Sequence, residues 1–426
     1  MRTRAEAGLV VLPLLLLAAC GTSTEDARQG SLTVETSVPV QTGADVLVSD
    51  SRNPLAGRRV GLIVNHTSRT ANGHVIDALA AMPDVEITAL FGPEHGIRGD
   101  ADAGEVVGDA RDPETGAPIY SLYGEHRAPT AEMLEHVDLL IFDMQDVGAR
   151  FYTYISTMGL SMQAAAEHGV PFMVLDRPNP LGGLRVDGYV REPEFESFVG
   201  QFPIPVQHGL TIGELATMIR DEGWLPGVDS LDLTVVTMQG WERSMLWPGT
   251  GLDWIAPSPN LPTFDAALVY AGTCLVEATT ASEGRGTDLP FLTIGAPWMD
   301  APAVADAIRL PGLTVDTLDI TPRSIPGAST HPKWQDEAIR AIRMDVTDAS
   351  TVRPLEVGIR LLTSMIQTAP DSTRESIIRS SGMARLSGTR RLETALRSGA
   401  SPEAIMAEWA DEVRAFETLR RSYLLY

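Results

Sequence analysis

The sequence contains few cysteines, few aromatic residues and few basic residues for its length of 426. Only Cys20 and Cys274 are present, which excludes the disulfide framework that holds many small secreted domains together. Lysine and arginine number 33 against 56 aspartates and glutamates, so the formal net charge is −23. Because nucleic-acid binding needs basic patches, this balance argues against nucleic acid as a partner. It does not exclude an anionic sugar, since a few local arginines can bind one carboxylate.

Several catalytic and cofactor motifs are also missing. The sequence has no His-Glu-x-x-His, no paired Cys-x-x-Cys, no Gly-x-Ser-x-Gly and no P-loop. The dinucleotide-binding glycine fingerprint does not follow the first expected strand, where residues 65–68 read NHTS. These absences weaken metalloprotease, serine-esterase and nucleotide-binding interpretations, and we expect neither a cofactor nor a metal.

The N-terminus has the pattern of an export signal. Arg2 and Arg4 precede an apolar run at residues 9–17, and residues 17–20 read LAAC. The run is too short for a comfortable membrane span, and a basic start before it is typical of a secretory signal. Cys20 follows small residues, as in a bacterial lipobox, so we expect cleavage after residue 19, lipidation of Cys20 and anchoring to the cell envelope. The alternative is a plain signal peptide with an incidental cysteine.

The remaining composition is that of a globular protein, with 44% hydrophobic and 21% charged residues. Residues 21–45 are polar and lack an apolar period, which predicts a flexible tether. The length favours two domains, which we expect at residues 46–300 and, as a smaller α+β domain, at 301–426.

Apolar runs and helical patterns alternate along the first of these domains. We expect strands at 59–65, 85–91, 137–143, 171–176 and 231–236, and helices at 74–82, 130–136, 156–168, 210–223, 354–368 and 402–419. Alternation of this kind predicts an α/β fold with a parallel, Rossmann-like sheet. Such sheets bind ligands at the carboxyl ends of their strands. This edge would gather Asn65, Glu94, Asp143, Asp146 and Asp176.

The segment FGPEHGIRG at residues 91–99 follows the second expected strand. It places Glu94, His95 and Arg98 among glycines, which let a backbone turn sharply near a ligand. A shielded glutamate has a raised pKa and can act as a general acid. The alternative is an ordinary turn in which Glu94 and His95 cap the next element.

The segment FDMQDVGARFYTY at residues 142–154 follows the third expected strand. Its candidates are Asp143, Gln145, Asp146, Arg150 and Tyr152, since paired carboxylates and aromatic faces suit a sugar site. The alternative is that Asp143 caps the next helix and that Asp146 and Arg150 form an ordinary ion pair.

Later loops supply further candidates for substrate binding. Prolines and glycines around Arg177 and Asn179 would fix these side chains in one direction, and His208 opens a helix. Trp247, Trp254 and the segment that contains Asn260 predict an aromatic wall, with core tryptophans as the alternative. The segment EATTASEGRGT at residues 277–287 carries Glu283 and Arg285, either as a substrate clamp or as a polar loop.

Taken in order, these segments resemble the exo-β-N-acetylmuramidase family, formerly a domain of unknown function. The resemblance rests on NHTS at 65–68, FGPEHG at 91–96, DMQDVG at 143–148, DRPNP at 176–180, SPN at 258–260, EGRGT at 283–287 and RSYLLY at 421–426. It extends from about Val46 to Tyr426. Residues 329–334 read STHPKW, whereas the family pattern leads us to expect a cysteine nearby, so the chain departs from the pattern on the C-terminal side of the pocket.

The resemblance implies a Rossmann-like domain, a smaller C-terminal domain and an active cleft between them. It also implies release of N-acetylmuramic acid from the non-reducing ends of peptidoglycan fragments, with the glutamate matching Glu94 as the favoured catalytic residue.

We therefore expect Glu94 to protonate the departing oxygen. Asp146 or Asp143, and less so Glu283, would activate water or assist the 2-acetamido group. Arg150, Arg177 or Arg285 would bind the lactyl carboxylate. The rival hypotheses are a non-catalytic cell-wall sugar-binding lipoprotein and a peptidoglycan amidase or esterase, which usually needs zinc or a nucleophilic serine.

Overall fold

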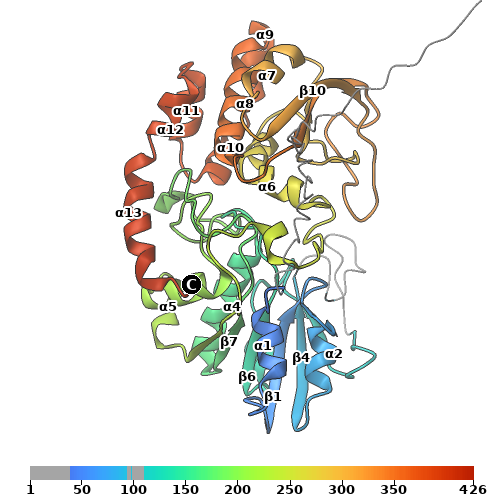
Figure 1. The fold of residues 1–426 in the computed structure, drawn as a ribbon, viewed down its shortest axis with the longest axis vertical. Coiled ribbons are helices and arrows are strands. Elements are labelled where there is room, and N and C mark those ends of the chain that lie inside the picture. The colour runs from blue at the N-terminus through green and yellow to red at the C-terminus, as the bar shows by residue number, and fades with distance from the viewer. Residues whose placement is uncertain (1–38, 94–96, 98–109) are drawn as a thin grey trace, which may run out of the picture. The chain divides into compact units, whose positions relative to one another are not determined.

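A six-stranded sheet forms the centre of the N-terminal region (Figure 1). The structure is a computed structural model that describes residues 39–93, 97 and 110–426. In spatial order the strands are β5 (Ile119–Ser121), β4 (Val85–Gly92), β1 (Arg58–Val64), β6 (Leu139–Asp143), β7 (Phe172–Leu175) and β8 (Leu233–Val236). All neighbours pair in parallel, which confirms the Rossmann-like class that the sequence predicts.

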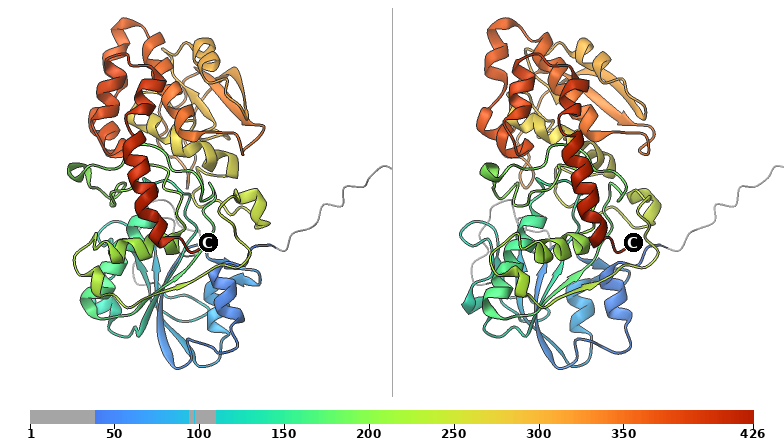
Figure 2. Two further views of the ribbon diagram at one scale, coloured as in Figure 1. Left: turned by 60° about the vertical axis from the view of Figure 1, so that its left-hand side comes forward. Right: turned by 90° about the vertical axis from the view of Figure 1, so that its left-hand side faces the viewer.

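Helices cover both faces of this sheet (Figure 2). On one face lie α1 (Gly43–Ser49) and α2 (Val75–Ala80), and on the other lie α4 (Tyr154–His168) and α5 (Ile212–Asp221), with α3 (Ala131–Leu134) beside α4. Strand β1 shows why both faces are apolar. Leu62 and Val64 join the core that contains α1 and α2, whereas Ile63 joins the core that contains α4 and α5. Successive side chains of a strand point to opposite faces, so a continuous apolar run fills two cores.

The C-terminal region is built from a small antiparallel sheet and a set of helices. The strands are ordered β10 (Leu313–Ile320), β11 (Ile339–Val346) and β9 (Thr293–Gly295). The helices are α6 (Phe264–Thr273), α7 (Ala301–Ala307), α8 (Pro354–Thr368), α9 (Asp371–Ile377), α10 (Ser380–Ser387), α11 (Arg391–Arg397), α12 (Pro402–Ala407) and α13 (Ala410–Arg420). Contacts join Val38–Tyr426 into one unit, so the expected domain boundary near residue 300 stays a prediction.

Two expectations about local structure are wrong. The expected tether reaches too far, because Val40 N–H donates to Thr250 O at 2.9 Å and α1 begins at Gly43. The single helix expected at residues 402–419 is two helices, α12 and α13. The break brings Trp409 inward, where its indole Nε1 donates to Asp187 Oδ1 at 2.7 Å. Because this hydrogen bond joins residues far apart in the sequence, the helical pattern of residues 402–419 does not predict it or the break that it accompanies.

Helices α6 and α8 approach closely through two glycines. A Cβ built on Gly272 would lie 1.8 Å from Pro354 O, and one on Gly358 would lie 2.4 Å from Gly272 O. Both neighbouring atoms are backbone, so neither can move away as a side chain can. The contact between the two helices therefore requires glycine at both positions.

Replacing Gly272 with alanine will lower the free energy of unfolding by about 3 kcal/mol, because overpacking forces the helices apart. The sign is informative, since Gly→Ala inside a helix usually stabilises by about 0.5–1 kcal/mol. Urea unfolding of the variant against Gly249→Ala measures the effect. The nearest atom to a Cβ on Gly249 is 3.9 Å away, so the control should unfold like the wild type. Equal midpoints for the two variants would contradict the assignment.

Candidate functional site

The carboxyl ends of β1, β6 and β7 lie along one edge of the parallel sheet (Figure 1). Polar residues stand at or directly after each of these ends. Asn65 follows β1 directly, and its Oδ1 accepts the Thr67 N–H at 2.9 Å and the Thr67 hydroxyl at 2.6 Å. Thr67 Oγ1 in turn accepts the N–H of Gln145 at 3.0 Å. The loops after β1 and β6 are thus fastened to each other. Asn65 Nδ2 remains without a partner among the described residues.

Asp143 and Arg177 form a buried ion pair between the ends of β6 and β7. Arg177 Nε donates to Asp143 Oδ1 at 2.5 Å and Nη2 donates to Oδ2 at 2.8 Å, with the two side chains 5% and 0% exposed. Arg177 Nη2 also donates to Arg69 O at 2.9 Å. Both carboxylate oxygens of Asp143 are therefore engaged, which fits a positioning role better than proton transfer.

Asp146 presents a different environment from Asp143. Its Oδ2 accepts the Gly148 N–H at 2.6 Å, while Oδ1 is buried without a partner among the described residues. His208 Nδ1 accepts the Leu210 N–H at 3.2 Å, so the proton of the neutral ring is on Nε2. This buried Nε2 lies 3.8 Å from Asp146 Oδ2 and also lacks a hydrogen-bond partner in the described part of the chain. Unmet buried groups cost about 1–3 kcal/mol each, so such a pair marks a site for a ligand.

Three other residues that the sequence suggests for substrate binding, all of which follow β6 or β7, contact other parts of the protein instead. Arg150 is fully buried and donates to Tyr189 O, Ile204 O and Leu386 O at 2.7, 2.8 and 2.9 Å. Burial lowers its pKa, and both of its terminal nitrogens donate to carbonyls while only Nε lacks a partner among the described residues, so the expected carboxylate clamp does not fit Arg150. It instead ties the sheet region to the end of α10.

Asn179 and Tyr152 also hold loops rather than open onto a ligand. Asn179 Nδ2 donates to Leu210 O at 2.9 Å, and its Oδ1 accepts the Leu181 N–H at 2.9 Å. The ring of Tyr152 is buried, 4.8 Å from the ring of Tyr154.

A second polar cluster comes from the C-terminal side of the chain. Glu283 is almost buried and lies 2.9 Å from Lys333 Nζ and 3.5 Å from Arg285 Nε. Arg285 Nη2 also pairs with Glu277 at 2.8 Å. Two cations thus lie beside Glu283, although its Oε2 makes no hydrogen bond among the described residues, and Arg285 is engaged by two glutamates rather than free to clamp a substrate. Asn260 connects another loop, since its Nδ2 donates to Ala328 O at 2.8 Å.

A pocket of about 690 Å³ lies at the same sheet edge. Its wall includes Gln145, Arg177 and Trp247, and the ring of Trp247 packs edge to face against Trp254 at 5.2 Å. The aromatic wall that the sequence suggests therefore has one member on the pocket. The pocket also includes Arg69, which no expected site contains although it is the first cation after the NHTS segment.

Asp176, expected at this edge, is part of the packing between β7 and the C-terminus. It is fully buried and accepts hydrogen bonds from the Thr211 hydroxyl at 2.8 Å and the Tyr426 hydroxyl at 2.7 Å. Burial raises the pKa of Asp176 to about 6, and its hydrogen bonds oppose that rise. The C-terminal residue is thereby attached to the sheet.

Glu94, His95, Arg98 and Cys20 lie outside the described residues. Pro93, which directly precedes Glu94, is buried at the end of β4. Within residues 39–93, 97 and 110–426, no three metal-binding side chains gather around one point, and no helix is both long and apolar enough for a membrane span.

Comparison with known proteins gives consistent matches over nearly the whole chain. Two family models, described as the N-terminal and C-terminal parts of exo-β-N-acetylmuramidase NamZ, match residues 60–265 and 268–426. A Bacillus subtilis protein named peptidoglycan β-N-acetylmuramidase NamZ is 42% identical over 391 residues, which is 91% of each chain.

Two solved structures of DUF1343 family proteins from Bacteroides fragilis share the fold. The first is 36% identical with a TM-score of 0.83 and covers 92% of this chain and 100% of its own. The second is 33% identical with a TM-score of 0.74, covering 91% and 99% respectively.

Proposed function

Because the chain belongs to the exo-β-N-acetylmuramidase family, we propose that it releases N-acetylmuramic acid from the non-reducing ends of peptidoglycan fragments. Membership of the family makes it a glycoside hydrolase that acts on peptidoglycan. The position of the cleaved bond, the identity of the general acid and the identity of the second catalytic carboxylate are all parts of this proposal.

The observation that carries the mechanism is the contrast among the three carboxylates. Both oxygens of Asp143 accept from Arg177, and Glu283 lies within ion-pair distance of Lys333 and Arg285 although its Oε2 makes no hydrogen bond among the described residues. Asp146 has no lysine or arginine partner in the described structure and keeps Oδ1 without a hydrogen bond. A carboxylate that receives a proton or assists a neighbouring amide needs such an oxygen. Asp146 is therefore the second catalytic group, and Asp143 positions Arg177.

Glu94 is the general acid in this mechanism. It follows Pro93 at the carboxyl end of β4, and β4 is separated from β6 by β1 alone. Adjacent strands lie about 4.8 Å apart, so the ends of β4 and β6 are about 10 Å apart, a spacing that admits a sugar between two side chains. Glu94 protonates the departing glycosidic oxygen, while Asp146 activates water or assists the 2-acetamido group. Asn65 Nδ2 and His208 Nε2 supply donors for the substrate.

The test is incubation of the protein with the disaccharide of N-acetylmuramic acid and N-acetylglucosamine, muramic acid at the non-reducing end. We expect both free sugars, no cleavage of the disaccharide in reverse order, and equal rates with and without a chelator. Binding without release would favour the sugar-binding lipoprotein. Activity abolished by the chelator and restored by zinc would favour metal-dependent chemistry.

We also propose that the protein is exported and anchored through lipidated Cys20. The support is the sequence pattern at residues 1–20 alone. In a bacterial host, Cys20→Ala should move the protein from the membrane fraction to the soluble or uncleaved fraction and abolish labelling by a fatty-acid analogue. Cys274→Ala is the control, because that thiol is buried. Unchanged labelling of Cys20→Ala would refute the anchor.

A further inference from the structure

Three side chains on the pocket at the sheet edge have polar groups that no described residue satisfies. Gln145 Oε1 and Trp247 Nε1 are buried and have no hydrogen-bond partner among the described residues. The amide orientation of Gln145 is fixed, because Nε2 donates to Asp146 O and Pro178 O, both at 2.8 Å. The third group is the guanidinium of Arg69, which has no ion pair or side-chain hydrogen bond within the described ranges. One acceptor and one donor without partners, and one cation, thus belong to residues that line one pocket.

The backbone of Arg69 is fixed although its side chain is exposed. Arg69 lies in β2 (Arg69–Thr70), which pairs with β3 (Gly73–His74), and Arg69 O accepts from Arg177 Nη2 at 2.9 Å. The turn of this hairpin is held by Ala71 N–H, which donates to Asp45 Oδ1 at 2.7 Å. A guanidinium on a fixed backbone loses little freedom beyond its own rotamers when it binds an anion.

The arginines expected from the sequence to bind a carboxylate are already occupied. Arg150 donates to three carbonyls, Arg177 is paired with Asp143, and Arg285 is paired with Glu277. Muramic acid differs from glucosamine by a lactyl ether, which carries a methyl group and a carboxylate. The pocket offers an apolar surface for the methyl group and a cation for the carboxylate, because Leu252 and Ile255 line it together with Arg69.

We infer that Arg69 binds the lactyl carboxylate of the muramic acid residue and so sets the preference for muramic acid over glucosamine. The inference rests on the proposed function, and it assigns specificity to a residue outside the catalytic groups. Two aspartates also line the pocket. Because they are negatively charged, a substrate carboxylate must pair directly with an arginine to be held there. Asp45 is engaged by the Thr42 N–H and hydroxyl at 2.9 and 2.7 Å, and Asp253 is exposed. They offset the two arginines, so the pocket does not attract anions by net charge.

The experiment compares two substrates that differ by one charge, the para-nitrophenyl β-glycoside of N-acetylmuramic acid and its lactyl methyl ester. Arg69→Ala should raise KM for the free acid by about 10- to 100-fold, the usual effect of losing a charged hydrogen bond. The KM of the ester should change less than about threefold, and kcat for both should stay close to wild type. Arg69→Lys should recover part of the loss, because a point charge pairs less well than a guanidinium fork.

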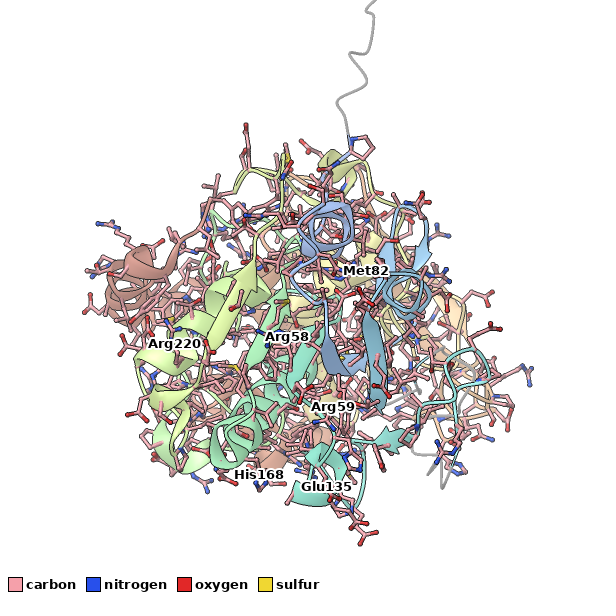
Figure 3. The ribbon with its side chains drawn as sticks, turned by 90° about the horizontal axis from the view of Figure 1, so that it is seen from below. Arg58, Arg59, Met82, Glu135, His168 and Arg220 are labelled. Atoms are coloured by element: carbon pink, nitrogen blue, oxygen red, sulfur yellow. The ribbon has the colours of Figure 1, made fainter. Side chains whose placement is uncertain are left out.

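The matched control is Arg58→Ala, which removes an exposed arginine from the start of β1, at the opposite end of the sheet (Figure 3). Its kinetics should equal those of the wild type for both substrates. The inference is overturned if Arg69→Ala leaves the KM for the acid unchanged, or if it raises the KM for acid and ester equally. In either case, release of muramic acid by the wild type would still support the proposed function. A wild-type protein that cleaves neither substrate overturns both.

Discussion

Replacing Glu94 with glutamine will lower kcat by about 1,000-fold on the muramic acid–glucosamine disaccharide, within the range that general acids contribute. Glutamine keeps the size of the side chain but cannot transfer a proton to the departing oxygen. The loss should be much smaller, about tenfold, on the para-nitrophenyl glycoside, because nitrophenolate leaves without full protonation. Parallel measurement of kcat on the two substrates therefore tests the role of the acid and not only its importance.

Glu86→Gln is the control for this experiment, because Glu86 is exposed near the start of β4, the strand that precedes Glu94 in the sequence. It should leave both rates unchanged. If Glu94→Gln loses equal activity on the two substrates, Glu94 acts in binding or as nucleophile and the acid role is refuted. If it retains wild-type turnover on the disaccharide, Glu94 has no part in the chemistry.

The parallel sheet could be predicted because its strands are buried on both faces. The run VGLIV at residues 60–64 is continuously apolar, so its length and the polar residue after it identify a strand without knowledge of its neighbours. The break at Trp409 and the close contact of Gly272 with Gly358 depend on partners far along the chain. Neither leaves a periodic signal, which is why the C-terminal helices were less predictable than the strands.

The structure brings some of the predicted site residues together at one edge of the sheet and engages others in contacts within the protein. Asn65, Gln145 and Arg177 do meet at the carboxyl edge of the sheet, because strand ends in a parallel sheet share one edge. Whether a charged side chain faces a ligand or a protein partner depends on contacts that sequence spacing does not encode. Arg150 illustrates this limit, since its partner Leu386 lies 236 residues away. Arg69, in contrast, has a fixed backbone and a side chain that no described residue pairs.

Asp143, the last residue of β6, and Asp146, in the loop after it, should give opposite results when each is changed to asparagine. Asp146→Asn should lower kcat by about 100-fold or more, because an amide cannot act as a base or assist the acetamido group. Its effect on stability should be under about 1 kcal/mol, since Oδ1 has no described partner and asparagine can still accept the Gly148 N–H. Asp143→Asn leaves Arg177 as a buried cation with a neutral neighbour, which should destabilise the fold by about 3–5 kcal/mol.

Urea unfolding and kcat measured on both variants separate the two roles. Loss of the carboxylate that transfers a proton should lower kcat, whereas loss of the carboxylate that holds an arginine should lower the free energy of unfolding. Asp143→Asn molecules that remain folded should keep more activity than Asp146→Asn molecules at the same folded fraction. The opposite order, with a stable but inactive Asp143→Asn and an active Asp146→Asn, would transfer the catalytic role to Asp143. It would also mean that the ion pair with Arg177 opens during turnover, since both oxygens of Asp143 are otherwise occupied.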